Sequence, residues 1–336
     1  MSEHNDPLWD PRLSGDPSLR ELERTLAPYS AAARGLQSLP VPAPARRNRR
    51  RRWPLALAAS LLLSVTLGFL AHHYRLSWAQ DRPWEVEQGT GQIAWLSPGE
   101  SITTDTHTAT LSVARIGSVR LAPQSTLRLL QTGPDRHRVV LESGHLRARI
   151  WAPPGYFGVR SGSAEVIDLG CEFDLWMQPD RSGRVTVHSG WIIYRLGGEE
   201  RAVPAQHSLT FDSQRPGTPL RDDAHQPLRE RVIQFDRLLA NVATDPAELD
   251  VIAAELAALA RDDDAFTMLS LLTQRPELAS GPLYPRLAEA LGLEGIDEHH
   301  RRRWSAGDPA VRHAWWERLP TQPKQWWRHW RDAFDQ

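Results

Sequence analysis

The sequence predicts a multi-domain membrane protein with a short cytoplasmic tail, one transmembrane helix, an all-β domain and a C-terminal α-helical bundle. Three observations predict this fold class. Residues 53–74 contain no Asp, Glu, Lys or Arg. Residues 84–212 consist of short β-rich runs separated by Gly, Pro, Ser and Asp. From about Leu228 onward, the apolar residues recur with a helical period.

The uncharged segment 53–74 is predicted to be a retained membrane span. Its roughly 22 residues would form a helix of about 33 Å, enough to cross a hydrocarbon core of ~30 Å. Two alternatives remain. A cleaved secretory signal is usually shorter and closer to the start Met, and a helix buried in a soluble core would not need flanking arginines. Tyr74 and Trp78 occupy positions typical of interfacial aromatic residues.

A run of arginines directly before this segment predicts its orientation. Six arginines precede the segment, and only Arg75 and Arg82 follow it closely. The topology-determining set is Arg46, Arg47, Arg49, Arg50, Arg51 and Arg52. By the positive-inside rule the N-terminus is cytoplasmic, and the C-terminus is periplasmic in a bacterial inner membrane. Beside a span, the run is interpreted as topological, and we expect no direct nucleic-acid binding.

The tail, residues 1–52, is predicted to hold one short amphipathic helix followed by a linker rich in Pro and Arg. Asp16 suits the N-cap, Pro17 the first helical position, and Pro28 is expected to end the helix. An isolated segment of this size cannot bury a core of its own. We therefore predict a partner-binding surface, with a solvated helix as the alternative. Its expected residues are Leu19, Leu22 and Leu26 on one face, with Trp9 nearby.

Residues 84–212 are predicted to form a β-sandwich or a β-roll of stacked hairpins. Runs such as "LSPGESI", "LAPQSTL" and "LESGHLRA" repeat an apolar residue, a tight turn and another apolar residue. In "LGCEFDL" the alternation places Leu169, Cys171, Phe173 and Leu175 on the buried face. Cys171 is thus predicted to be a structural thiol. As the only cysteine, it excludes an intramolecular disulfide.

Residues 225–336 are predicted to be an α-helical, Trp-rich extension. Asp245 and Pro246 form a helix-start signal, with apolar residues on one face of the following segment. The tryptophans near the C-terminus have two interpretations, core packing or a surface for a partner, glycan or membrane. They are Trp315, Trp316, Trp326, Trp327 and Trp330.

The sequence offers no constellation that predicts catalysis. It contains no Gly-rich phosphate loop, no nucleophile elbow and no paired carboxylates at strand ends. The neighbouring pairs His72-His73 and His299-His300 point about 100° apart on a helix, so neither pair can easily chelate a metal alone. We therefore expect a protein that is not an enzyme and that has no catalytic residues, cofactor or metal.

The β region resembles the periplasmic domain of the FecR family of transmembrane regulators. The resemblance rests on the ordered segments "GQIAWLSPGESITT", "GSVRLAPQSTLRL", "LESGHLRARI", "AEVIDLGCEFDL" and "VTVHSGWIIY". It implies an anti-sigma factor whose cytoplasmic tail binds an extracytoplasmic-function sigma factor. The periplasmic part would receive a signal from an outer-membrane transducer or another periplasmic protein. The tail is shorter than in iron-uptake members, and the helical extension departs from them.

A second interpretation of the same features is an envelope scaffold or binding protein. In that case the β domain and the Trp-rich helices bind an envelope polymer or protein, and the tail and span serve only as an anchor.

Overall fold

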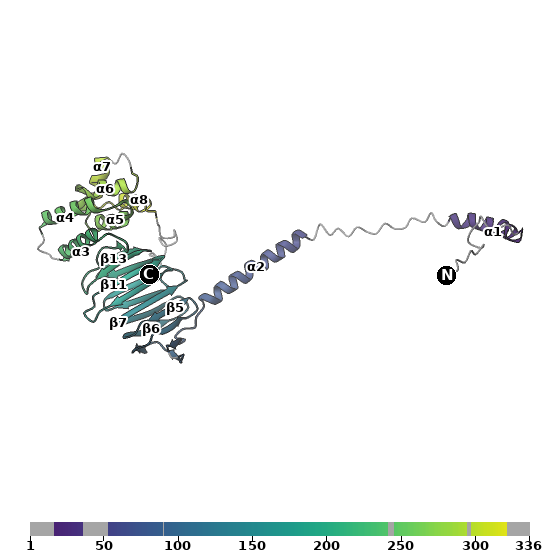
Figure 1. Ribbon diagram of the computed structural model, residues 1–336, viewed down its shortest axis with the longest axis horizontal. Coiled ribbons are helices and arrows are strands. Elements are labelled where there is room, and N and C mark those ends of the chain that lie inside the picture. The colour runs from purple at the N-terminus through teal and green to yellow at the C-terminus, as the bar shows by residue number, and fades with distance from the viewer. Residues whose placement is uncertain (1–16, 36–52, 90, 241–244, 294–296, 321–336) are drawn as a thin grey trace, which may run out of the picture. The chain divides into compact units, whose positions relative to one another are not determined.

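The computed structural model describes residues 17–35, 53–89, 91–240, 245–293 and 297–320 (Figure 1). The chain divides into two units, Met1–Thr66 and Leu67–Gln336. The first unit contains α1 and the beginning of α2, and the second contains the rest of α2, the strands and the C-terminal helices.

Helix α1 spans Pro17–Gly35 and continues through Pro28. The prediction that Pro28 ends this helix is therefore wrong. A proline inside a helix removes one backbone donor and strains the preceding turn. That penalty is local, and the segment after it contains the three residues Ala31–Ala33, which have the highest helix propensity. The tail thus contains a longer helix than expected.

Helix α2 spans Trp53–Leu76. Its composition is mostly aliphatic, with Ser60, Ser64 and Thr66 as polar exceptions before the final turns, which contain His72, His73 and Arg75. The hydroxyls of Ser60 and Thr66 donate to backbone carbonyls of the preceding turn, at Leu57 (2.9 Å) and Leu62 (2.8 Å). A hydroxyl that bonds within its own helix is not left unpaired on an apolar surface.

The strands begin at Trp84 and form two sheets. The first sheet has the order β2-β1-β4-β5-β7-β10-β11-β14-β15, and the second has the order β3-β6-β7-β8-β9-β12-β13. Neighbours are antiparallel except for the parallel pair β7 and β8. The bounds are β1 Trp84–Gln88, β2 Ile93–Leu96, β3 Ser101–Thr104, β4 Ala109–Val113, β5 Gly117–Leu121, β6 Ser125–Thr132, β7 His137–Ile150, β8 Phe157–Ser161, β9 Ala164–Asp168, β10 Glu172–Met177, β11 Gly183–Ser189, β12 Trp191–Leu196, β13 Glu199–Pro204, β14 His207–Phe211 and β15 Leu220–Arg221.

Strand β7 belongs to both sheets because it changes partners at Gly144. Up to Ser143 it pairs with β6, and from Gly144 onward it pairs with β10. Gly144 has φ +96°, a conformation that L side chains rarely adopt, and a Cβ there would lie 2.2 Å from Ser125 Oγ. Glycine is therefore required at the point where the chain passes from one sheet to the other.

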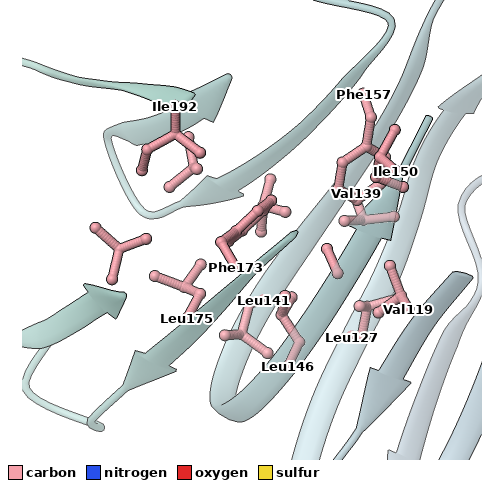
Figure 2. Packing of buried hydrophobic residues seen from close by; sticks show 14 of the residues in the cluster. Val119, Leu127, Val139, Leu141, Leu146, Ile150, Phe157, Phe173, Leu175 and Ile192 are labelled. Atoms are coloured by element: carbon pink, nitrogen blue, oxygen red, sulfur yellow. The ribbon is translucent and has the colours of Figure 1, made fainter. Parts of the chain in front are cut away.

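The core of the β domain lies between the two sheets. Val119 and Phe173 from the first sheet and Leu127 and Val139 from the second all belong to one buried cluster (Figure 2). Their strands show the alternating burial of half-exposed β-structure. The β-sheet domain predicted from the sequence is confirmed at this level.

The chain after the strands is helical. The helices are α3 Gln226–Ala240, α4 Pro246–Leu259, α5 Ala265–Gln274, α6 Leu283–Ala290, α7 Glu298–Ser305 and α8 Pro309–Trp316, with 3₁₀ turns η3 Asp262–Asp264 and η4 Pro276–Ser280. Asp245 caps α4 by accepting from the Ala247 N–H, with Pro246 in the first turn, as the sequence predicts.

These helices share a second hydrophobic core with the β domain. Trp191 and Ile193 of β12 are buried in the same cluster as residues from the helices. The Trp191 ring meets the Phe266 ring of α5 edge-on, with centroids 5.6 Å apart. Trp315 is buried and Trp316 packs against the cluster, which favours core packing for these two tryptophans. Trp326, Trp327 and Trp330 lie outside the described residues.

Candidate functional site

Two leucines of α1 are exposed on one side of the helix. The side chains of Leu22 and Leu26, one turn apart, are 53% and 52% exposed. The Leu19 side chain and Trp9 lie outside the described part of the chain. The structure therefore brings together two of the four predicted contact residues as an unpartnered apolar pair in the unit Met1–Thr66. Every described side chain of α1 is exposed, so this pair is distinguished by its apolar character and its spacing.

Helix α2 presents a continuous apolar surface. Every described side chain from Leu57 to Arg75 is exposed. Among the described residues, one helix segment, Leu57–Leu76, is long and apolar enough to cross a membrane by length and composition. At about 1.5 Å per residue, its 20 residues span about 30 Å. The six arginines predicted to orient it, Arg46, Arg47, Arg49, Arg50, Arg51 and Arg52, lie outside the described residues.

One arginine of the β domain holds the C-terminal end of α2. The Arg115 guanidinium donates to the backbone carbonyls of Tyr74 (3.0 Å) and Ser77 (2.9 Å). It also lies over the Tyr74 ring, 3.8 Å from the centroid, and 5.4 Å from that of Trp78. We call these contacts the Arg115 clamp. The Tyr74 carbonyl also accepts from the Ser77 hydroxyl at 3.0 Å, so Arg115 is one of two side-chain donors to this helix end.

The clamp depends on the tight connection between β4 and β5. Ala114 has φ +48° and Ile116 donates its N–H to the Val113 carbonyl, so the chain reverses within three residues. This turn places Arg115 at the tip of a hairpin whose strands pair along their length. Sequence reasoning missed Arg115, because one arginine among many carries no local signal of a contact 41 and 38 residues away.

The outer surface of the first sheet carries a linked set of two histidines, an aspartate and a tryptophan. Asp174 Oδ1 lies 3.1 Å from His145 Nε2, and Asp174 Oδ2 lies 2.6 Å from His188 Nε2. The His145 ring stacks on Trp176 at 3.8 Å. Burial would raise the pKa of Asp174, but the hydrogen bonds to both histidines hold it below its ordinary value. Trp176 lines a surface hollow of about 780 Å³.

Cys171 is buried beside the carboxyl group of Asp168. Its backbone N–H donates to Asp168 Oδ1 at 3.0 Å, and its thiol hydrogen-bonds the same oxygen. Burial raises the pKa of the Cys171 thiol well above its ordinary value, and the neighbouring Asp168 raises it further. A thiol that stays protonated is a poor nucleophile. The predicted burial of Cys171 is confirmed.

Comparison with known proteins gave limited matches. No family model matches the sequence, and no curated protein matches it. Two crystal structures of a "putative anti-sigma factor" from Parabacteroides distasonis match 40% of this chain each, at 17% and 16% identity with TM-scores of 0.33 and 0.32. This chain spans 65% and 64% of the length of those two chains. A likeness at this level does not establish a shared function.

Proposed function

We propose that this protein is a single-pass inner-membrane regulator of the FecR type that acts as an anti-sigma factor without catalysis. In this proposal the cytoplasmic tail binds an extracytoplasmic-function sigma factor. The periplasmic β domain receives an envelope signal from an outer-membrane transducer or another periplasmic protein. Support comes from the ordered FecR-like segments of the β region and from the exposed apolar surfaces of α1 and α2.

The observation that carries the proposal is the exposed pair Leu22 and Leu26 on α1, in a different unit from the β domain. An amphipathic helix without a core of its own gains stability by laying its apolar face into a partner's groove. In the sequence, the apolar segment Leu57–Leu76 comes after this helix and before the strands of the β domain. If that segment spans the membrane, the partner of α1 is cytoplasmic, because the arginine run precedes the span.

The test is co-purification of a sigma factor with the full chain from detergent-solubilised membranes of the source organism. Leu22→Asp should abolish co-purification and raise transcription from a reporter of the sigma factor. Burying one leucine contributes about 1.5–3 kcal/mol, so its loss weakens binding by roughly 10- to 100-fold. Arg24→Asp is the matched control, because it introduces the same side chain on the opposite side of α1.

A sigma factor that co-purifies equally with the native chain and with Leu22→Asp would refute the contact surface. If no sigma factor co-purifies from membranes in which candidates are present, the regulatory proposal fails.

The alternative, an envelope scaffold anchored in the membrane, is favoured by three exposed tryptophans of the β domain. Trp95, Trp151 and Trp176 are 60%, 55% and 53% exposed. Large exposed aromatic side chains are typical of binding surfaces. In this role a chain without residues 1–45, which keeps all six arginines before the span, would retain its function in the envelope. A regulator with the same deletion would no longer bind a sigma factor.

A further inference from the structure

The outer surface of the second sheet contains a hollow with an excess of positive charge. Its volume is about 510 Å³, and its walls come from the strands β6, β8, β9 and β12 and from the start of β7. The charged residues that line it are four arginines and one glutamate, a net charge of +3 (4 − 1). They are Arg136, Arg138, Arg160, Arg195 and Glu165. We call this site the arginine hollow.

Strand register places the charges of the arginine hollow side by side. Arg160 of β8 lies opposite Glu165 of β9, and Glu165 lies opposite Arg195 of β12. Residues directly opposite each other in neighbouring strands project from the same side of the sheet. Three strands therefore contribute one charged row, and β7 adds Arg138 next to it.

Arg138 is the buried floor of the arginine hollow. Its side chain is only 12% exposed, and its Nε donates to Glu165 Oε1 at 3.1 Å. To reach β9 it crosses β8 at Gly158, where a Cβ would lie 3.1 Å from Arg138 Cδ. It also donates to the carbonyls of His137 (3.0 Å) and Tyr156 (3.3 Å). The guanidinium is thus fixed in place before any ligand arrives.

The glutamates near the hollow do not balance its arginines. Glu165 is shared between Arg138 and Arg195, the second at 3.9 Å, and Arg195 also pairs with Glu200 at 2.8 Å. Counting Glu200 and Asp135, whose negative charge also acts on Arg138, the surplus is one positive charge (4 − 3). Arg160 is exposed and has no ion pair among the described residues.

Burial is the largest influence on the pKa of the Arg138 guanidinium. Burial lowers this pKa and so does the positive charge of Arg136, whereas the negative charge and the hydrogen bond of Glu165 raise it. Like charges gathered around a concave surface raise the local potential and attract anions. Along the row of Arg160, Glu165 and Arg195 the charges alternate. Four arginines nevertheless line the same hollow, whose floor is the fixed guanidinium of Arg138.

We propose that the arginine hollow binds a small soluble molecule bearing phosphate or carboxylate groups. Guanidinium groups bind both oxyanions through paired hydrogen bonds, and Arg160 and Arg195 line the hollow from the two strands on either side of Glu165. The volume lies within the range of small-molecule sites and exceeds that of a single phosphate ion. This site does not depend on the proposed sigma-factor contact.

The test is calorimetric titration of the full chain in nanodiscs of zwitterionic lipid, with pyrophosphate and succinate as probes. We expect saturable binding of at least one probe. Arg160→Gln should weaken it about tenfold or more, because a charged hydrogen-bonding partner is lost. Glu165→Gln should strengthen binding, because it removes negative charge while its carbonyl can still accept from Arg138. Arg120→Gln, an exposed strand arginine of the first sheet, is the matched control and should change nothing.

A protein that binds neither probe would overturn the proposal. Equal losses of affinity in Arg160→Gln and Arg120→Gln would also overturn it, because the effect would then come from the overall charge of the protein and not from the hollow. Weaker binding by Glu165→Gln would contradict the electrostatic reasoning. Repetition in phosphatidylglycerol nanodiscs separates the two sources of phosphate. Unchanged affinity for the probe supports a soluble ligand. Loss of probe binding would mean that a lipid headgroup occupies the hollow, and the proposal of a soluble ligand would then be wrong.

Discussion

Replacing Arg115 with alanine should loosen the end of α2, although Leu76 and Trp78 still pack against the core of the β domain. The substitution removes two guanidinium-carbonyl hydrogen bonds and the stacking on Tyr74. Hydrogen bonds of charged groups contribute about 1.5–3 kcal/mol, and we reduce this to roughly 0.5–1 kcal/mol each because the site is partly exposed. The cation–π contact adds about 0.5–1 kcal/mol. The clamp therefore contributes about 2 kcal/mol, equivalent to roughly a 30-fold change in the local opening equilibrium.

Hydrogen exchange measured by mass spectrometry on the full chain in nanodiscs tests this value. Peptides covering residues 74–82 should exchange roughly 30-fold faster in Arg115→Ala, whereas peptides from the core strand β7 should not change. Arg115→Lys should give an intermediate rate, because lysine keeps the charge but not the planar stack. Arg120→Ala is the control for loss of an arginine on the adjoining strand. Equal exchange in the native chain and in Arg115→Ala would refute the clamp.

Three further predictions concern stability, measured by chemical unfolding of the full chain in detergent. Burial raises the pKa of Asp168 to about 7, so folding favours the protonated carboxyl and stability should fall as pH rises from 5 to 8. Over this pH range the group lowers the free energy of unfolding by about 3 kcal/mol, and Asp168→Asn should lack that decrease. Equal pH slopes in the native chain and in Asp168→Asn would contradict the prediction. Trp304→Ala should cost about 3–5 kcal/mol, since its ring is fully buried against Tyr284 and Trp315, and Trp304→Phe should cost much less. Gly144→Ala should cost roughly 2–4 kcal/mol through the clash with Ser125 and the strained φ; an unchanged midpoint would contradict it.

Local patterns predicted the strands well where one side of a strand is buried. In "LGCEFDL" the alternating residues Leu169, Cys171, Phe173 and Leu175 are all buried, as expected. Leu169 nevertheless belongs to the core shared with the helices, and the other three to the core between the sheets. Alternation identifies the buried side of a strand, but it does not identify which element covers it.

The sequence contains a pattern that predicts the core shared by β12 and the C-terminal helices. Strand β12, "WIIYRL", is apolar at nearly every position, and both of its sides are buried. Ile192 and Tyr194 face the core between the sheets, and Trp191 and Ile193 face the helices. A continuous apolar run of this kind indicates a strand that is covered on both sides. The boundaries predicted at 84–212 and 225–336 treated the two regions as separate, although β12 contributes to both cores.

The candidate sites could not be found in the same way. The Arg115 clamp and the arginine hollow depend on contacts between residues that are far apart in the chain. Arginine supplies almost all the basic residues of this sequence, so no single arginine stands out before the strand register is known. The leucines of α1 were predictable because their spacing lies within one helix.

Under the proposed function, a signal received by the β domain must reach α2, and the strengths of the intervening contacts indicate where a change can occur. From β14 to β5 the first sheet is one continuous ladder through β11, β10 and β7. Such a ladder, packed over a closed core, moves as a rigid body rather than deforming. Spatial continuity alone is not evidence of coupling, which requires an element with two accessible states. The Arg115 clamp, at about 2 kcal/mol, is weak enough for a bound partner to open or close it. A signal is therefore better transmitted by release or engagement of this clamp than by distortion of the sheet.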